Sequence, residues 1–320
     1  MKALLANIRH VALDLDGTVY LGGRLFKSTK PLLGLLDELG VGYTFLTNNP
    51  SRSTAEYLAH LRQVGIEASS GQLYTSTQAT IEYLRAHWPG VRRLFVLGTA
   101  GLCQDLEAAG LTLLPDDAGA CPDAVLVGLD STLTYARLCR AAWWIKQGKP
   151  YFATNPDRVC PTDEPTVLVD CGSITAALKE ATGCAPKAVL GKPDPAMLEG
   201  IMRRHSLRPE NLAMVGDRLY TDMAMARRAG AVGVLVLSGE TTAAQAQREQ
   251  PPPDFIFPTL AEFGGQLRLA RRGRNRSPGR KPSSAKPRGR SPAAPPTMGK
   301  ERPCVRGGKV LADCVDFDRQ

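Results

Sequence analysis

Two carboxylates stand two positions apart where the first apolar run of the chain ends. Asp14 and Asp16 follow residues 11–13 and come directly before Gly17. An extended chain would point the two side chains to opposite faces, but a turn at Gly17 lets both reach one pocket. A carboxylate can attack phosphorus, and a second carboxyl group can protonate the leaving oxygen and then activate water. Two like charges this close also require a cation, unless one of them holds a proton.

Three further apolar runs also end in polar side chains. The runs cover residues 43–46, 188–190 and 212–215, and they lead to Thr47-Asn48-Asn49, to Lys192, and to Asp217 with Asp222 beyond it. Buried parallel strands read as such apolar runs, and an open α/β sheet binds its ligands at the carboxyl ends of its strands. We therefore expect four strands to deliver these side chains to one crevice.

These side chains suit a divalent cation and a phosphate group. Asp217 offers a hard oxygen ligand for Mg²⁺, which takes one or two carboxylates together with waters and substrate phosphate oxygens. Asp222 is expected to orient a metal-bound water or another ligand, without binding the metal itself. Lys192 can neutralise charge that develops on a phosphoryl group. The Thr47 hydroxyl and the amides after it can hydrogen-bond phosphate oxygens, so the sequence predicts phosphoryl chemistry with Mg²⁺ as cofactor.

The four motifs, in this order, resemble those of the haloacid dehalogenase (HAD) superfamily: DLDGT at 14–18 resembles the first, Thr47 the second, Lys192 the third and GDRLYTD the fourth. The NagD-like branch is resembled most closely, through TNNPSRS at 47–53, ATNPD at 153–157, GKPDP at 191–195 and GDRLYTD at 216–222. The resemblance covers about 1–266. It implies a cap domain between the second and third motifs and hydrolysis of small phosphomonoesters, such as sugar phosphates or nucleoside monophosphates.

The resemblance also implies a role for each motif residue. Asp14 would be the nucleophile and Asp16 the general acid and base, and an Asp at position 16 favours phosphoryl chemistry over dehalogenation. Mg²⁺ would be bound by Asp14, the backbone carbonyl of Asp16, and Asp217. The transferring phosphoryl group would be held by Thr47, Asn48 and Lys192. Transfer of the phosphoryl group to another sugar uses the same intermediate and stays open as the alternative to hydrolysis.

Residues of the insertion carry weaker signals. Asn155 and Asp157 match the branch's Thr-Asn-x-Asp pattern, and they either face the substrate or form a tight turn. Asn49 likewise either contacts the substrate or turns the chain. The branch commonly has Pro-Gly-x-Gly before an Ile, whereas residues 170–174 read Asp-Cys-Gly-Ser-Ile. This departure leaves open how the leaving group is recognised.

Strand and helix signals alternate along the chain, which predicts an α/β fold. Residues 1–79 and 183–266 are expected to form a Rossmann-like HAD core with a parallel sheet, and residues 80–182 an inserted α/β cap of the C2 type. In the core, helices are expected after Pro31, after an N-cap within 51–54, and from Ser76 to Trp88. In the insertion, strands are expected at 93–98, 111–114, 123–129 and 151–155, and helices at 102–110 and 135–148.

The formal net charge of +9 belongs to the end of the chain. Residues 271–320 hold 14 of the 40 Lys and Arg residues but only 4 of the 31 Asp and Glu residues. The segment 267–320 has too few apolar residues to offset its ordering entropy, so we expect a disordered basic tail. Such a tail can bind nucleic acid or another acidic surface. No RNA-binding motif or interleaved aromatic residues accompany it, so specific nucleic-acid binding is not expected.

The last expectations concern compartment and assembly. The 8 cysteines form no Cys-x-x-Cys and have no zinc-finger spacing. The first residues do not read as a secretory signal, and no apolar run approaches the roughly 18–20 residues that span a bilayer. We therefore expect a cytoplasmic, soluble protein without a membrane span. The resemblance adds a homodimer formed through the cap.

Overall fold

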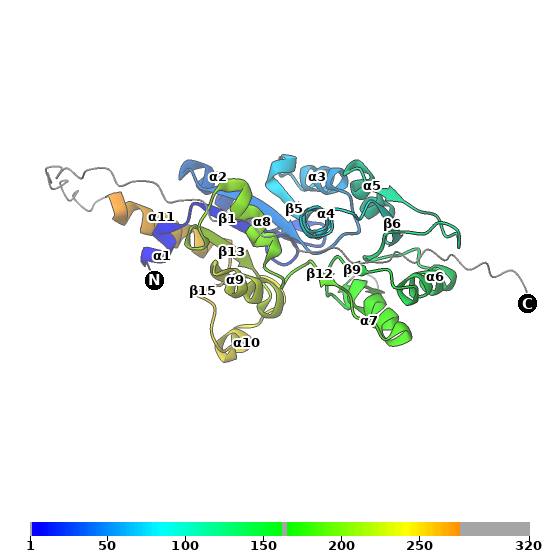
Figure 1. Ribbon diagram of the computed structural model, residues 1–320. Coiled ribbons are helices and arrows are strands. Elements are labelled where there is room, and N and C mark those ends of the chain that lie inside the picture. The colour runs from blue at the N-terminus through cyan, green and yellow to red at the C-terminus, as the bar shows by residue number, and fades with distance from the viewer. Residues whose placement is uncertain (1, 162–164, 276–320) are drawn as a thin grey trace, which may run out of the picture. The chain divides into compact units, whose positions relative to one another are not determined.

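A computed structural model describes residues 2–161 and 165–275 of the chain (Figure 1). Its larger sheet has six parallel strands in the spatial order β15-β14-β13-β1-β4-β5. β1 lies inside the sheet, with β13 on one side and β4 on the other. The six strands are β1 (His10–Asp14), β4 (Gly42–Thr47), β5 (Leu73–Thr75), β13 (Leu212–Gly216), β14 (Val232–Val236) and β15 (Phe255–Phe257).

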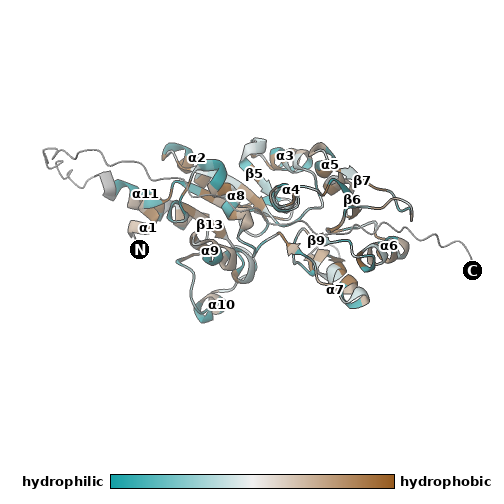
Figure 2. Ribbon diagram, viewed as in Figure 1, coloured by the Kyte–Doolittle hydropathy of each residue, from teal (hydrophilic) through white to brown (hydrophobic). Residues whose placement is uncertain are grey.

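Alternate side chains of this sheet pack into two separate apolar layers. Val11 and Leu13 of β1 belong to one layer and Ala12 to the other. A strand that is buried on both faces requires this arrangement. The first layer is covered by α1 (Lys2–Asn7), α2 (Thr29–Glu38) and α11 (Leu260–Asn275), and the second by α8 (Ala196–His205) and α9 (Ala224–Ala229). Figure 2 shows the result as apolar strands between helices that carry both apolar and polar residues.

The helices that follow β4 and β5 begin at reciprocal caps. Before α3 (Thr54–Gln63), the Ser53 hydroxyl accepts from the Glu56 backbone N–H at 3.3 Å, and the Glu56 carboxylate accepts from the Ser53 N–H at 2.7 Å. Thr75 and Gln78 cap α4 (Ser76–His87) in the same way. These caps satisfy backbone donors that would otherwise be unpaired at a helix start. They confirm the N-cap predicted within 51–54 and the helix predicted from Ser76.

A second sheet has five parallel strands in the order β12-β9-β8-β6-β7. They are β6 (Arg93–Leu97), β7 (Thr112–Leu113), β8 (Ala124–Val127), β9 (Tyr151–Ala153) and β12 (Ala188–Val189). One face packs against α6 (Tyr135–Lys146) and α7 (Cys171–Thr182), and the other against α4 and α5 (Ala100–Ala108). The second α/β series predicted from the sequence is therefore present, and we refer to it as the cap.

One predicted core strand lies in the cap sheet instead. The apolar run 188–190 was expected to form a strand of the core, and residues 183–266 were assigned there. β12 pairs with β9, in the register Ala188 to Phe152 and Val189 to Ala153, so the assignment of residues 188–189 to the core sheet is wrong. An apolar run indicates a buried strand but carries no information about which of two neighbouring sheets it joins.

The tail predicted over 267–320 begins too early. Residues 267–275 continue α11, where Leu267 and Ala270 are buried together with Leu260 and Phe263. This helical spacing extends the apolar stripe of the helix beyond the residue at which composition alone ended the core. The rest of the predicted tail, 276–320, lies outside the described residues.

The remaining elements are short. They are two hairpins, β2–β3 (Tyr20–Leu21 and Arg24–Leu25) and β10–β11 (Val159–Pro161 and Val167–Val169), 3₁₀ turns at Ser70–Gln72 and Pro209–Asn211, a π-helical turn at Leu219–Met223, and α10 (Ala243–Arg248). Among the helices of residues 2–161 and 165–275, none is both long and apolar enough to cross a membrane.

Candidate active site

Three of the four predicted motifs sit at the carboxyl ends of neighbouring core strands. Asp14 is the last residue of β1, Thr47 is the last residue of β4, and Asp217 follows β13 directly. The chain turns after Asp14 at Gly17, whose φ of 83° lies in the left-handed region. A side chain at Gly17 would overlap the Asp217 carboxylate. Glycine therefore lets the first motif approach the fourth.

Three carboxylates and one ammonium group meet at these strand ends. Oxygens of Asp14, Asp217 and Asp222 all lie within 4.8 Å of one another, and all three residues are buried. The Lys192 ammonium donates to Oδ1 of Asp14, and to Oδ1 of Asp222 at 2.8 Å. Asp222, which was predicted to orient a ligand without binding the metal, lies in the same cluster. The structure therefore brings these four residues together at the strand ends, as the sequence predicted.

Burial governs the ionisation of this cluster. Desolvation, opposed by Lys192 and reinforced by Asp222 and Asp217, raises the pKa of Asp14 to about 8. Desolvation and Asp222 raise the pKa of Asp217 to about 6. Burial by itself would lower the pKa of Lys192, but Asp14 and Asp222 outweigh it and the pKa is raised. One ammonium group thus faces three carboxylates, which leaves the cluster short of positive charge.

One oxygen of the cluster lacks a partner. Oδ2 of Asp217 accepts from the Glu240 backbone N–H at 2.6 Å, but its buried Oδ1 has no hydrogen bond within residues 2–161 and 165–275. A buried carboxylate oxygen without a partner is costly, because its hydration has been lost without replacement. Three clustered carboxylates with such an oxygen fit a divalent cation.

Asp16 lies apart from the buried cluster. Its side chain is exposed, whereas Asp14 is only 8% exposed. Partial desolvation raises the pKa of Asp16, against the opposing charges of Arg218 and Lys192. A raised pKa favours the protonated carboxyl group that a general acid needs. The two aspartates therefore occupy different environments, one buried beside an ammonium group and one exposed to solvent.

Asn48 joins the second and third motifs but has no side-chain donor left for a ligand. Its amide nitrogen donates to the Lys192 carbonyl at 3.0 Å and to Oδ2 of Asp157 at 2.9 Å, and its oxygen accepts from the Lys192 N–H at 2.6 Å. Both amide hydrogens are therefore in use. This geometry therefore argues against the contact between the Asn48 side chain and a phosphoryl group that the resemblance implied.

The other predicted substrate-binding residues also hold the protein together. Asn155 is fully buried and donates to Asp157 at 3.2 Å and to Asp170 at 3.4 Å. Asn49 accepts from the Ser51 N–H at 2.8 Å, as expected of a residue that turns the chain. Of the two alternatives for Asn155 and Asn49, the structure favours loop formation.

Sequence reasoning missed a fifth strand end at the site. β14 is an apolar run that leads to Ser238 and Glu240. The Ser238 hydroxyl donates to the Gly17 carbonyl at 2.7 Å, and the Glu240 N–H holds Asp217. The rule that located the other motifs, an apolar run followed by polar residues, also applies to residues 232–240.

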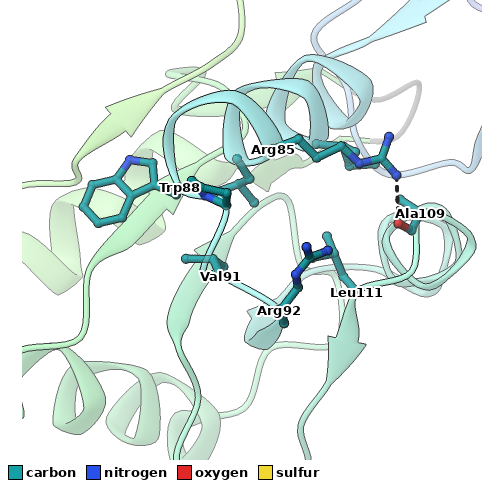
Figure 3. Close-up of a pocket in the computed structure, with 9 residues that line it drawn as sticks. Arg85, Trp88, Val91, Arg92, Ala109 and Leu111 are labelled. Carbon is teal, nitrogen blue, oxygen red and sulfur yellow. Dashed lines mark hydrogen bonds between the residues drawn. The ribbon is translucent and has the colours of Figure 1, made fainter.

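A separate hollow of about 280 Å³ lies on the cap (Figure 3). It is formed by α4, the end of α5 and the segment between α4 and β6, and no residue of the carboxylate cluster lines it. Figure 3 shows Arg85 donating across it to the Ala109 carbonyl, at 2.8 Å. The residues labelled there are Arg85, Trp88, Val91, Arg92, Ala109 and Leu111. The hollow is thus distinct from the carboxylate cluster.

A buried aspartate cluster with a lysine, at the carboxyl ends of a parallel sheet and beneath an inserted cap, is the arrangement of a hydrolase of the HAD class. Family models agree: residues 11–112 match the haloacid dehalogenase-like hydrolases, and residues 189–263 match the HAD-hydrolase-like family. An acid sugar phosphatase of Staphylococcus aureus is 31% identical over 255 residues, which cover 80% of this chain and 96% of that protein. The chain belongs to the HAD-like hydrolases and is a phosphoric monoester hydrolase.

Solved structures place it in the NagD-like branch. The 4-nitrophenylphosphatase of Thermotoga maritima has a TM-score of 0.77 and 38% identity, over 82% of this chain and 98% of that one. NagD of Escherichia coli K-12 has a TM-score of 0.72 and 27% identity, over 80% and 98%. A magnesium complex of the Mycobacterium tuberculosis glycerol phosphate phosphatase has a TM-score of 0.73 and 33% identity, over 82% and 77%; its calcium complex is also similar.

Proposed function

We propose that the protein is a Mg²⁺-dependent phosphatase that hydrolyses small phosphomonoesters through an aspartyl-phosphate on Asp14. The observation that carries this proposal is the cluster of Asp14, Asp217 and Asp222 with the Lys192 ammonium at the carboxyl ends of the core strands. Side chains fixed by buried strand ends are pre-organised, which is the main requirement of phosphoryl transfer.

The residues that would hold Mg²⁺ are Asp14, Asp217 and the backbone carbonyl of Asp16. Oδ1 of Asp217, which has no hydrogen bond within the part of the chain that the structure describes, supports this assignment. When bound, the ion would offset charge on the phosphoryl oxygens. Asp222 accepts from Lys192 and from the Arg218 N–H, so its proposed role is to hold Lys192 and the fourth motif in place.

In the proposed reaction, a carboxylate oxygen of Asp14 attacks phosphorus and the ester oxygen leaves. Asp16 donates its proton to that oxygen, and then takes a proton from the water that hydrolyses the aspartyl-phosphate. Lys192 and the Thr47 hydroxyl would contact the phosphoryl oxygens throughout. The Lys192 ammonium that donates to Asp14, which favours its charged form, and the exposure of Asp16 support this division of roles.

The substrate we propose is the phosphate ester of a sugar or small polyol. Two relatives that match most of this chain support this proposal: one is named an acid sugar phosphatase and the other a glycerol phosphate phosphatase. A homodimer through the cap and a cytoplasmic location stay predictions of the sequence.

The test is phosphate release from a panel of sugar, glycerol and nucleoside phosphates, with Mg²⁺ and with a chelator. We expect turnover that requires Mg²⁺ and falls at least about 10³-fold in Asp14→Asn, because the nucleophile is lost. A matched control is Asp37→Asn, which changes an exposed carboxylate on α2. Turnover that survives in Asp14→Asn would overturn the mechanism. Adding glycerol as acceptor and analysing the products separates hydrolysis from transfer.

A further inference from the structure

The loop that follows Thr47 makes hydrogen bonds with two separate parts of the cap. On one side, Asn48 bonds to Asp157, as described above. On the other side, the first turns of α5 lie against residues 50–54, at the start of α3. Because this loop runs from the predicted phosphate-binding hydroxyl to the first turn of a core helix, contacts with it can act on the site.

Asp105 makes several of these contacts with a single residue, Thr54. Its carboxylate accepts from the Thr54 backbone N–H, with N–O distances of 3.1 and 3.0 Å, and from the Thr54 hydroxyl at 2.9 Å. Thr54 is the first residue of α3, where backbone donors have no partner within the helix. A carboxylate at a helix start is also favoured by the helix dipole. The cap thus supplies to a core helix an acceptor that the helix itself lacks.

The surroundings of Asp105 make the contact specific. Asp105 is half-buried, and desolvation raises its pKa while both bonds from Thr54 lower it. Gln78 of α4 donates to the Thr54 hydroxyl at 3.3 Å, which leaves that hydroxyl's proton for Asp105. A desolvated carboxylate held by charge-assisted hydrogen bonds fixes direction as well as distance.

Neighbouring contacts also join the start of α5 to this loop. The Thr99 hydroxyl, which caps α5, donates to the Ser51 carbonyl at 2.9 Å. Gly101 lies so close to the loop that an added Cβ would come within 2.5 Å of the Ser53 nitrogen. The start of α5 therefore meets residues 51–54 without intervening side chains.

The loop transmits this restraint back to Thr47. The Tyr57 hydroxyl, from the first turns of α3, donates to the Asn49 carbonyl at 2.8 Å. The Asn49 N–H in turn donates to the Thr47 hydroxyl oxygen at 3.2 Å. Two hydrogen bonds to the backbone of Asn49 thus connect the first turns of α3 with the end of β4.

We propose that Asp105 is a positioning residue of the phosphatase: from the cap, it fixes the start of α3 and so holds Thr47 and its loop in register with Asp14. This inference rests on the proposed function, in which Thr47 contacts the phosphoryl group. Small displacements of groups that contact a reacting phosphate are costly, and about 1 Å can cost 10²-fold in rate.

The test compares Asp105→Ala with Glu107→Ala, an exposed carboxylate on the same helix. With 4-nitrophenyl phosphate and Mg²⁺, we expect kcat of Asp105→Ala to fall about 10- to 100-fold with KM changed less than about 3-fold, because the loop is misplaced in the transition state. Asp105→Asn keeps one acceptor oxygen for the Thr54 N–H and should recover part of the rate. Glu107→Ala should behave as wild type.

A second measurement separates positioning from mere stability. Orthovanadate, a mimic of the transferring phosphoryl group, should bind Asp105→Ala at least about 10-fold more weakly in the presence of Mg²⁺. Loss of thermal stability with unchanged kcat and unchanged vanadate affinity would overturn the proposal. If Asp105→Ala does not fold, Asp105→Asn and Thr54→Val decide the same question.

The outcomes also distinguish this inference from the proposed function. An active wild type with an equally active Asp105→Ala refutes the positioning role alone. A wild type that hydrolyses no phosphoester refutes the proposed function, and unaltered vanadate binding by Asp105→Ala would then refute the positioning role as well.

Discussion

At the scale of single residues, Lys192 has the central place in the site. Its ammonium group is the partner of two buried carboxylates. The Asn48 side chain forms hydrogen bonds with both the backbone N–H and the carbonyl of Lys192. A buried ion pair contributes little net stability, but removal of one partner leaves an uncompensated charge. The lysine therefore serves the charge balance of the site more than the stability of the fold.

Replacing Lys192 by Met tests this charge balance. We expect kcat for 4-nitrophenyl phosphate to fall about 10²- to 10³-fold, because a cation aimed at the developing charge is lost. Lys187→Met, which changes an exposed cap lysine, is the matched control. Phosphate release at saturating Mg²⁺ measures both. A Lys192→Met enzyme within 2-fold of wild type would contradict the role assigned to the ammonium group.

Asp217 provides a second test at this scale. Since its Oδ1 has no hydrogen bond in the described residues, we expect it to be a metal ligand more than a structural acceptor. Asp217→Asn should raise the Mg²⁺ concentration for half-maximal activity by at least about 10-fold, which a titration of activity against Mg²⁺ measures. Glu210→Gln, on the surface turn before β13, should leave that concentration unchanged. Equal Mg²⁺ requirements would contradict the assignment.

At the scale of elements, the fourth-motif strand was easier to predict than the third. β13 has four buried apolar residues before Gly216, and its polar ending is fixed by the strand's place beside β1. β12 has two half-buried residues, so its partner is decided by the cap strand β9 and not by its own sequence. Lys192 still reaches the site, because the turn after β12 returns the chain to Asn48.

His10, at the start of β1, is expected to make the stability of the folded protein depend on pH. His10 is 4% exposed, lies 2.8 Å from the Thr44 hydroxyl of β4, and stacks on His205 of α8 at 4.2 Å between ring centroids. Desolvation, and then the charge of His205, lower the pKa of His10 to about 4. An unfolded chain would restore the ordinary value of 6.5. The unfolded state thus binds more protons between these values.

The consequence is that His10 contributes stability above pH 6.5, and this contribution is lost as the pH falls towards 4. The loss is at most about 3 kcal/mol. Urea unfolding at pH 7 and pH 4.5 measures it in wild type and in His10→Gln, with His87→Gln of exposed His87 as control. The difference between the two pH values should shrink in His10→Gln alone. An unchanged difference would show that His10 titrates as an exposed histidine.

At the scale of the whole molecule, the sequence predicted the parts better than their boundaries. Strand-end motifs located Asp14, Thr47 and Asp217, because parallel strands bring their carboxyl ends together whatever lies between them. The end of the core was missed, because α11 continues its apolar stripe through Leu267 and Ala270 into a basic sequence. The internal bonding of Asn48 and Asn155 was also beyond sequence, since it depends on how the cap meets the core.

The same view predicts that Mg²⁺ stabilises the folded protein as well as activating it. Three buried carboxylates with one ammonium group repel one another in the folded chain, whereas an unfolded chain solvates them separately. A cation that binds only the folded state adds about 2.7 kcal/mol at a hundred times its Kd. For a chain of this size we expect a rise in Tm of roughly 4–5 °C over the same protein in a chelator.

Variants of the cluster provide the control for this rise in Tm. Asp14→Asn and Asp217→Asn each remove one carboxylate from the cluster, so each should be more stable than wild type in the chelator and gain less from Mg²⁺. Asp37→Asn, on the surface helix α2, should gain as much as wild type. Differential scanning calorimetry with and without Mg²⁺ measures all four proteins. If the wild-type Tm were the same in both buffers, the cluster would be balanced by protons alone, and the metal assignment would fail together with the Mg²⁺ dependence proposed for the phosphatase.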